Sequence, residues 1–201
     1  MASGTQVQAG GFTPDCFADL QRPGATTTYA ADEHVAQDAV AAGGVSPLKF
    51  PAVRNPNGAG IITGARLCKS TATVDSAGFR LWLWNNQPFA AGAYPLDNAA
   101  LVNQYTFTAL QSLIGWIDFA TADFLAHSAS ASCEGVPNRP CLPFTLRNSR
   151  RGSASTDDFV EIAGVGRVTA DRLVYGTLST LGAYVPGALE RFRVTLDVQQ
   201  D

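Results

Sequence analysis

The sequence has few charged residues and no long hydrophobic run. Only 15% of its 201 residues are charged, against about 25% in an average soluble protein, while hydrophobic residues make up 46%. This composition is too apolar for a chain that is disordered along its length. No apolar run approaches the roughly 18 residues of a membrane-spanning helix, so we expect no membrane partner. The net charge of -3 leaves no broad basic surface, so we expect no nucleic-acid partner.

Histidine is scarce and the cysteines are widely spaced, which disfavours a metal site. His34 and His127 lie far in sequence from the cysteines, which are Cys16, Cys68, Cys133 and Cys141. No pair has the close spacing of a zinc site, so we expect neither a metal nor a cofactor. Cys133 and Cys141 flank a proline-containing loop and either form a disulfide after release from the cell or stay free. A reducing compartment favours two free thiols.

The sequence also lacks catalytic motifs. It contains no G-x-S-x-G, no H-E-x-x-H and no P-loop. Gly164, Val165 and Gly166 resemble part of a dinucleotide fingerprint, but the third glycine is missing, so a turn or a bulge is the better interpretation. The carboxylates show no spacing that pairs two of them across a cleft. We therefore expect that the protein is not an enzyme.

Short runs with β character dominate the chain. Residues 79–84 alternate strictly, with Phe79, Leu81 and Leu83 on one face and Arg80, Trp82 and Trp84 on the other. Further strands are predicted over residues 27–35, 61–69, 113–119, 142–146, 159–162, 172–181 and 192–198. One short helix is predicted over residues 97–105, capped by Asp97. Many short strands between Gly, Pro and Asn turns predict an all-β sandwich or barrel, and we expect a β-sandwich of jelly-roll type.

Two segments differ in composition from the β-rich part. Residues 1–25 are rich in Gly, Ser, Thr, Gln and Pro and predict an extended N-terminal arm anchored by Phe12 and Phe17, followed by one sandwich domain over residues 26–201. This N-terminal segment has neither the basic nor the apolar region of a secretory signal, so we expect synthesis in a cytoplasm. Residues 126–158 predict a long surface excursion with one strand-like piece.

Basic residues are mostly arginine. Lys49 and Lys69 are the only lysines among 14 basic residues. Arginine is enriched at protein interfaces, while coding bias in a GC-rich genome explains the same count. The only local basic cluster is Arg147, Arg150 and Arg151, which would suit an acidic surface on a partner protein.

Several stretches resemble a known family. They are residues 58–67 (GAGIITGARL), 78–85 (GFRLWLWN), 97–100 (DNAA), 114–118 (IGWID), 173–176 (LVYG), 182–186 (GAYVP) and 192–196 (FRVTL). In this order they are similar to a family of small β-rich virion proteins of tailed bacteriophages, encoded beside the major capsid protein. The resemblance covers residues 26–198 except 126–158. It implies a head decoration, or cement, protein on the outer capsid surface, with the major capsid protein and other copies of itself, as a homotrimer, for partners.

Two functional hypotheses follow. In the first, the protein stabilises a phage head, and Phe12, Phe17 and Leu20 lie across capsid subunits. The 126–158 excursion, with its arginine cluster, then either reaches a neighbouring copy or faces solvent. In the second, it is a receptor- or glycan-binding module of the tail or of a head fibre. There, Trp82, Trp84 and Trp116 would stack on sugars, unless they fill the core. Copy number in the virion separates the two hypotheses.

Overall fold

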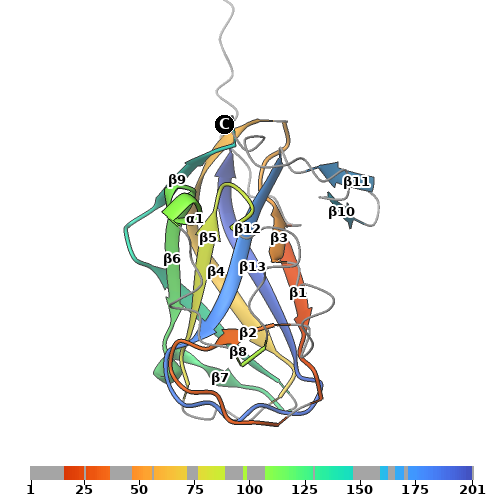
Figure 1. Ribbon diagram of the computed structural model, residues 1–201, viewed down its shortest axis with the longest axis vertical. Helices are drawn as coiled ribbons and strands as arrows, with labels where there is room; N and C mark the ends of the chain where they lie inside the picture. The colour runs from red at the N-terminus through yellow and green to blue at the C-terminus, as the bar shows by residue number, and fades with distance from the viewer. Residues whose placement is uncertain are drawn as a thin grey trace, which may run out of the picture.

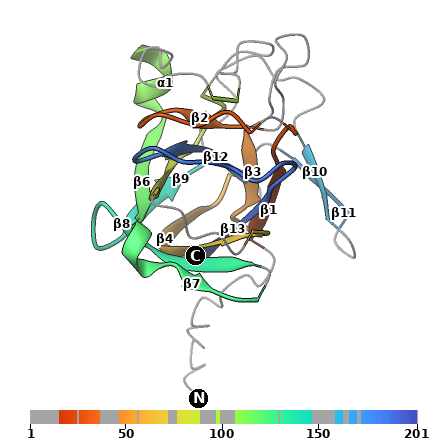
Figure 2. The same ribbon diagram turned by 90° about the horizontal axis from the view of Figure 1, so that it is seen from below.

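The chain folds into an antiparallel sheet of eleven strands that curls on itself (Figures 1 and 2). This is a computed structural model, and it describes residues 16–24, 26–36, 47–55, 57–71, 77–88, 97–98, 107–128, 130–146, 159–162, 166–169 and 172–200. The main strand order is β1-β13-β4-β8-β6-β5-β12-β2, while β3 pairs with β12, β7 with β8 and β9 with β4. The all-β prediction is confirmed.

The elements have the following bounds in chain order. They are β1 (Phe17–Gln21), β2 (His34–Val35), β3 (Leu48–Pro51), β4 (Ala59–Lys69), β5 (Phe79–Trp84), α1 (Phe107–Gln111), β6 (Leu113–Phe119), the 3-10 turn η1 (Thr121–Asp123), β7 (Leu125–Ala126), β8 (Ala131–Pro137), β9 (Leu142–Thr145), β10 (Phe159–Ile162), β11 (Gly166–Thr169), β12 (Leu173–Thr180) and β13 (Arg191–Gln200). The hairpin β10–β11 forms a separate two-stranded sheet, drawn to one side of the main sheet in Figure 1.

The curl brings two halves of the sheet face to face. One half contains β1, β13, β4, β9 and β7, and the other contains β6, β5, β12, β3 and β2. β8 joins them, because its first residues pair with β4 and its last two pair with β6. The core lies between the halves, where the Phe79 ring packs against those of Phe124, Tyr184 and Phe192 at centroid distances of 6.0, 5.1 and 5.5 Å.

The strands with strict alternation are where the sequence predicts them. The predicted ranges 79–84, 113–119 and 159–162 coincide with β5, β6 and β10. In β5 the side chains of Phe79, Leu81 and Leu83 enter the core, while Arg80 and Trp82 lie on the outer face. Of the predicted strand 27–35, only His34–Val35 is a strand, and Tyr29 adds an isolated bridge to Tyr184.

The N-terminal arm is shorter than predicted, because residues 17–21 are strand β1 of the main sheet and pair with β13. Every second side chain in this segment faces the core, namely those of Cys16, Ala18 and Leu20. The prediction was wrong here because two of the inward residues, Cys16 and Ala18, are small and the outward Phe17 is apolar, so the segment shows no clear apolar–polar alternation. Residues 1–15, including Phe12, lie outside the described residues.

The predicted excursion at 126–158 is also wrong over its first part, which forms the end of β7 and all of β8 and β9. The inward positions of β8 are small, including Ala131, Cys133 and Gly135, so the apolar signal is weak. Gly135 has to be small, because a Cβ there would lie 2.5 Å from Ile117 Cγ2 and 2.6 Å from Phe119 Cε1. Residues 147–158, which carry the cluster Arg147, Arg150 and Arg151, lie outside the described residues.

The predicted helix at 97–105 is described only at its start. Asp97 and Asn98 form a turn there, with Asn98 at a φ of 61°. The remaining residues of that range lie outside the description, as do Gly164 and Val165, while Gly166 begins β11. The short helix α1 follows at Phe107–Gln111 and was not predicted.

Candidate functional site

A buried ion pair fastens the N-terminal segment to a distant turn. Arg22 follows β1, and its Nη2 donates to Asp97 Oδ2 at 2.9 Å; the two side chains are 1% and 4% exposed. The Arg22 Nε donates to the Tyr29 hydroxyl, which donates in turn to Asp97 Oδ1 at 2.5 Å. The backbone N–H of Ala36 donates to the same oxygen at 2.9 Å. The Asp97 carboxylate thus joins three segments of the chain.

A second buried carboxylate, Glu190, lies before β13. The hydroxyls of Tyr184 and Thr71 donate to its two oxygens, and the Gly187 N–H donates to Oε2 at 3.2 Å. The Lys69 Nζ lies 4.0 Å from Glu190 Oε1 and 5.1 Å from the centre of the Tyr184 ring. Both charged side chains are almost fully buried, so each neutralises the other away from water.

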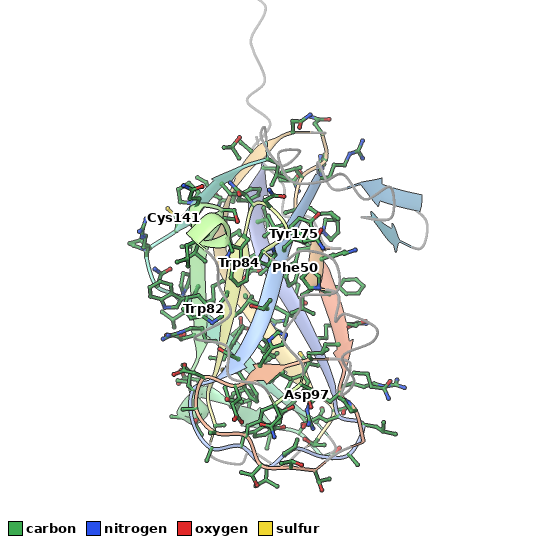
Figure 3. The ribbon with its side chains drawn as sticks, viewed as in Figure 1. Phe50, Trp82, Trp84, Asp97, Cys141 and Tyr175 are labelled. Carbon is green, nitrogen blue, oxygen red and sulfur yellow. The ribbon has the colours of Figure 1, made fainter. Side chains whose placement is uncertain are left out.

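The two groups form one unit, which we call the buried clasp: Arg22, Tyr29, Lys69, Asp97, Tyr184 and Glu190. Tyr29 and Tyr184 exchange backbone hydrogen bonds of 2.8 and 3.1 Å, and Arg22 Nη1 donates to the Gly187 carbonyl at 3.3 Å. Burial raises the pKa of both tyrosines above the ordinary value, so both hydroxyls stay protonated and donate. The clasp therefore fixes the loops at one end of the sheet, where Figure 3 shows Asp97.

The clasped end exposes large apolar side chains. Leu125, Val185 and Leu189 are 68, 53 and 56% exposed. Leu125 is in β7 and the other two are in the β12–β13 connection, and Figures 1 and 2 place both elements at this end. Leu189 has a φ of 54° in a turn closed by the Glu190 N–H and the Gly187 carbonyl, 3.3 Å apart. A leucine in this left-handed region is strained, and a glycine would fit there at less cost.

The outer face of β5 and β6 carries a compact group of aromatic and charged side chains. Trp82 and Trp116 are directly opposite each other, with ring centroids 5.4 Å apart. The Arg80 guanidinium lies 5.4 and 5.3 Å from their ring centres. Asp118 accepts from Arg80 Nε and Nη2 at 2.6 and 2.9 Å, which fixes the guanidinium in place. Trp82 Nε1 donates to Ser179 Oγ at 3.2 Å.

Trp82, Trp84 and Trp116, the three tryptophans predicted to stack on sugars or fill the core, differ in burial. Trp84 is fully buried and packs with Leu173 and Tyr175, so it is not available to stack on a ligand (Figure 3). Trp82 and Trp116 are half-buried and present part of their rings at the surface. Alternation alone placed Trp82 and Trp84 on the same face of the strand, but only the packing around that face distinguishes them.

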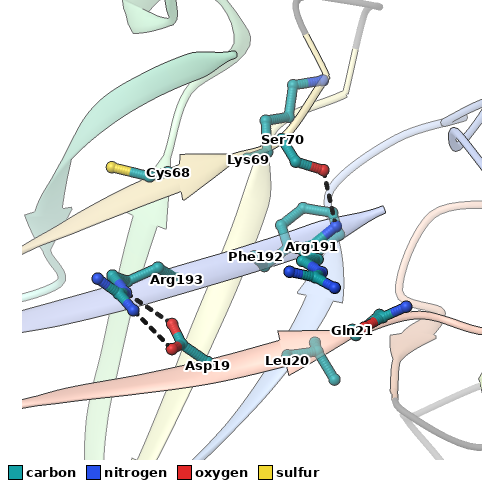
Figure 4. Close-up of a pocket in the computed structure, with 9 residues that line it drawn as sticks. All are labelled: Asp19, Leu20, Gln21, Cys68, Lys69, Ser70, Arg191, Phe192 and Arg193. Carbon is teal, nitrogen blue, oxygen red and sulfur yellow. Dashed lines mark hydrogen bonds and ion pairs between the residues drawn. The ribbon is translucent and has the colours of Figure 1, made fainter. Parts of the chain in front are cut away.

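The outer face of the half that contains β1, β13 and β4 carries charged side chains. A shallow groove of about 490 Å³ runs over β1, β13 and β4 (Figure 4). Asp19 accepts from Arg193 there through two bonds of 2.7 Å, and the Arg193 guanidinium lies 4.4 Å from the Phe17 ring centre. Both members of that ion pair are half exposed, which is typical of a solvated surface.

The predicted contact residues Phe17 and Leu20 are therefore not part of a free arm. Leu20 is buried in the core at 5% exposed, so it cannot lie across a capsid subunit. Phe17 is half-buried beneath Arg193. The clasp and the exposed Leu125 and Leu189 were not predicted. The clasp residues are far apart in sequence, and a leucine within a turn was the one local signal of an unusual site.

The four cysteines are free thiols. Cys16 and Cys133 are buried, and burial raises the pKa of Cys133 to about 11. Of the two alternatives for Cys133 and Cys141, the structure has the free thiols. In the described part of the chain, no group of three or more His, Cys, Asp or Glu side chains could hold a metal ion. No helix among the same residues is long and apolar enough to cross a membrane.

Comparison with known proteins found no matching family model, curated protein or solved structure. The resemblance to the phage family therefore stays a prediction from the sequence.

Proposed function

We propose that the chain is a structural virion protein that binds the outside of a tailed-phage capsid and stabilises the head. In this proposal the curled sheet is a jelly-roll-type scaffold without catalytic activity. The major capsid protein is its partner, and three copies assemble together on the outer capsid surface after synthesis in the host cytoplasm. The family resemblance suggested this role, and the clasped end gives it a physical basis.

The observation that carries the proposal is the combination of exposed apolar side chains with rigid loops. Val185 and Leu189 stand on the β12–β13 connection, which the buried clasp fixes through Tyr184, Gly187 and Glu190. Leu125 stands on β7, which is held by its pairing with β8. A surface that is already ordered loses little conformational entropy on binding. Leu189 keeps an exposed apolar side chain at a backbone angle that favours glycine, which supports a binding role for this side chain.

The apolar side chains at the clasped end replace some of the capsid-contact residues that the sequence suggested. They take the place of Phe17 and Leu20, which belong to the sheet. Phe12 and the arginine cluster at 147–151 remain proposed contacts. A contact of a few apolar side chains is weak in one copy, and a trimer would strengthen it by joining three contacts in one assembly.

The deciding experiment measures the copy number of the chain relative to the major capsid protein in purified virions. We expect a ratio near one to one, and we expect particles that lack the chain to rupture at a lower temperature. A ratio of a few per hundred would contradict the proposal. It would favour the alternative, a receptor- or glycan-binding module of the tail or of a head fibre.

A further inference from the structure

The Trp82–Trp116 row has the chemistry of a ligand platform. The centroids of the two indole rings are 5.4 Å apart, and the Arg80 guanidinium lies over both rings, 5.4 and 5.3 Å from their centres. Each ring is partly open to solvent. The next row along the strands, with Trp84 and Tyr175, is fully covered. One aromatic row on this face is therefore covered, and the adjacent row is partly accessible.

The platform is held in place before any ligand arrives. Asp118 fixes Arg80 through two hydrogen bonds of 2.6 and 2.9 Å, and Ser179 fixes the Trp82 indole at 3.2 Å. All four positions are on adjacent strands, whose ladder sets their spacing. A preformed site of this kind loses little entropy when a ligand binds.

Polar groups at the edge of the platform remain available. The Trp116 side chain makes no hydrogen bond in the part of the chain that the structure describes, so its indole N–H is free to donate. The Arg80 and Asp118 side chains are 25 and 36% exposed, so donors and acceptors lie next to the rings. The opposite charges of Arg80 and Asp118 offset each other, and Asp32 adds a negative charge near Arg80, so the site does not favour an acidic ligand.

We infer that the Trp82–Trp116 row binds a neutral saccharide. One face of a pyranose ring presents C–H groups and packs on an indole, as other apolar groups do on aromatic rings. The hydroxyls at the ring edge donate to Asp118 and accept from Arg80 and from the Trp116 N–H. Aromatic faces beside a few placed polar groups are typical of small-molecule sites. This inference stands independently of the capsid proposal.

The test begins with the unmodified chain on an array of immobilised neutral, amino and acidic oligosaccharides. We expect binding to neutral hexose or N-acetylhexosamine glycans and no preference for acidic ones. The soluble form of the bound oligosaccharide is then titrated while the three indole N–H signals are followed by NMR. The signals of Trp82 and Trp116 should shift and that of Trp84 should not, because Trp84 is buried.

Variants give a second readout. Trp116→Ala should weaken binding on the order of tenfold, which corresponds to about 1.4 kcal/mol for the lost aromatic contact. Trp116→Phe keeps a ring for packing and should restore part of the affinity. Phe17→Ala is the matched control, because Phe17 also lies beside an arginine but on the opposite half of the sheet. It should leave binding unchanged.

Three outcomes would overturn the inference. The first is no binding to any saccharide on the array. The second is binding that shifts neither the Trp82 nor the Trp116 signal, or that Phe17→Ala weakens equally. The third is binding of a proline-rich peptide in place of sugars, since such peptides also dock on tryptophan rings. None of these outcomes depends on copy number in the virion, so they leave the capsid proposal unaffected.

Discussion

Removing the charge of Asp97 tests whether the buried clasp holds the N-terminal segment in the fold. Asp97→Asn keeps the size of the side chain but removes the negative charge that lies 2.9 Å from the buried Arg22 guanidinium. Breaking a buried pair in this way costs about 3–5 kcal/mol, a large part of the roughly 5–15 kcal/mol that stabilise a typical domain. We expect a loss within this range, because the asparagine oxygen replaces only one of the two accepting oxygens and the amide N–H group faces another donor.

The assay is urea unfolding, in which the midpoint falls while the slope stays constant if only stability changes. Asp19→Asn is the matched control. Asp19 also makes a two-bond pair with an arginine, but both side chains are 54% exposed. Exposed pairs contribute about 0–1 kcal/mol, so this variant should stay close to the unmodified protein.

A double variant completes the test. Arg22→Met together with Asp97→Asn removes both charges of the ion pair. The double variant should therefore lose less free energy of unfolding than the two single variants lose in sum, with a coupling of about 2 kcal/mol. The reasoning is refuted if Asp97→Asn costs no more than Asp19→Asn, or if the two single effects simply add.

Three further predictions concern separate parts of the molecule. Leu189→Asn should change the free energy of unfolding by less than about 1 kcal/mol, because asparagine adopts a positive φ readily. The same variant should rebind less well than the unmodified protein to capsids that lack the chain. Equal rebinding would contradict the docking role. Burial lowers the pKa of His34 from 6.5 to about 4. The unfolded chain therefore takes up a proton first, and about 3 kcal/mol of stability is lost as the pH falls from 6.5 to about 4. His34→Gln should remove this part of the pH dependence in urea unfolding, and an unchanged profile would refute it. A thiol reagent should titrate the half-buried Cys68 and Cys141 in the folded protein and the two buried cysteines only after unfolding; four fast thiols would contradict the burial.

Strands with large alternating side chains were predictable because their signal is local. In β5, Phe79, Leu81 and Leu83 alternate with polar or amphipathic residues, and any sheet with one buried face would keep that pattern. β8 was not predictable in the same way. Its inward residues are small, and the reason for Gly135 is the space that Ile117 and Phe119 occupy on another strand.

For the candidate sites, the sequence could suggest which residues take part but not which of them lie together. The sequence suggested that Trp82, Trp84 and Trp116 either stack on a ligand or fill the core, and it did not distinguish the buried Trp84 from the other two. It could not show that Trp82 and Trp116 are opposite each other, because strand pairing depends on the register between β5 and β6. The clasp was missed for a similar reason, since Arg22 and Asp97 are 75 residues apart.

The sequence by itself determined that this chain is all-β and where its strongly alternating strands lie, because hydrophobic periodicity acts over a few neighbouring residues. The tertiary structure alone decided which charges are buried, which tryptophans stay open and where the N-terminal segment joins the sheet. Burial is a property of what packs against a residue. For Arg22, Trp84 and Leu20, those neighbours come from distant parts of the chain.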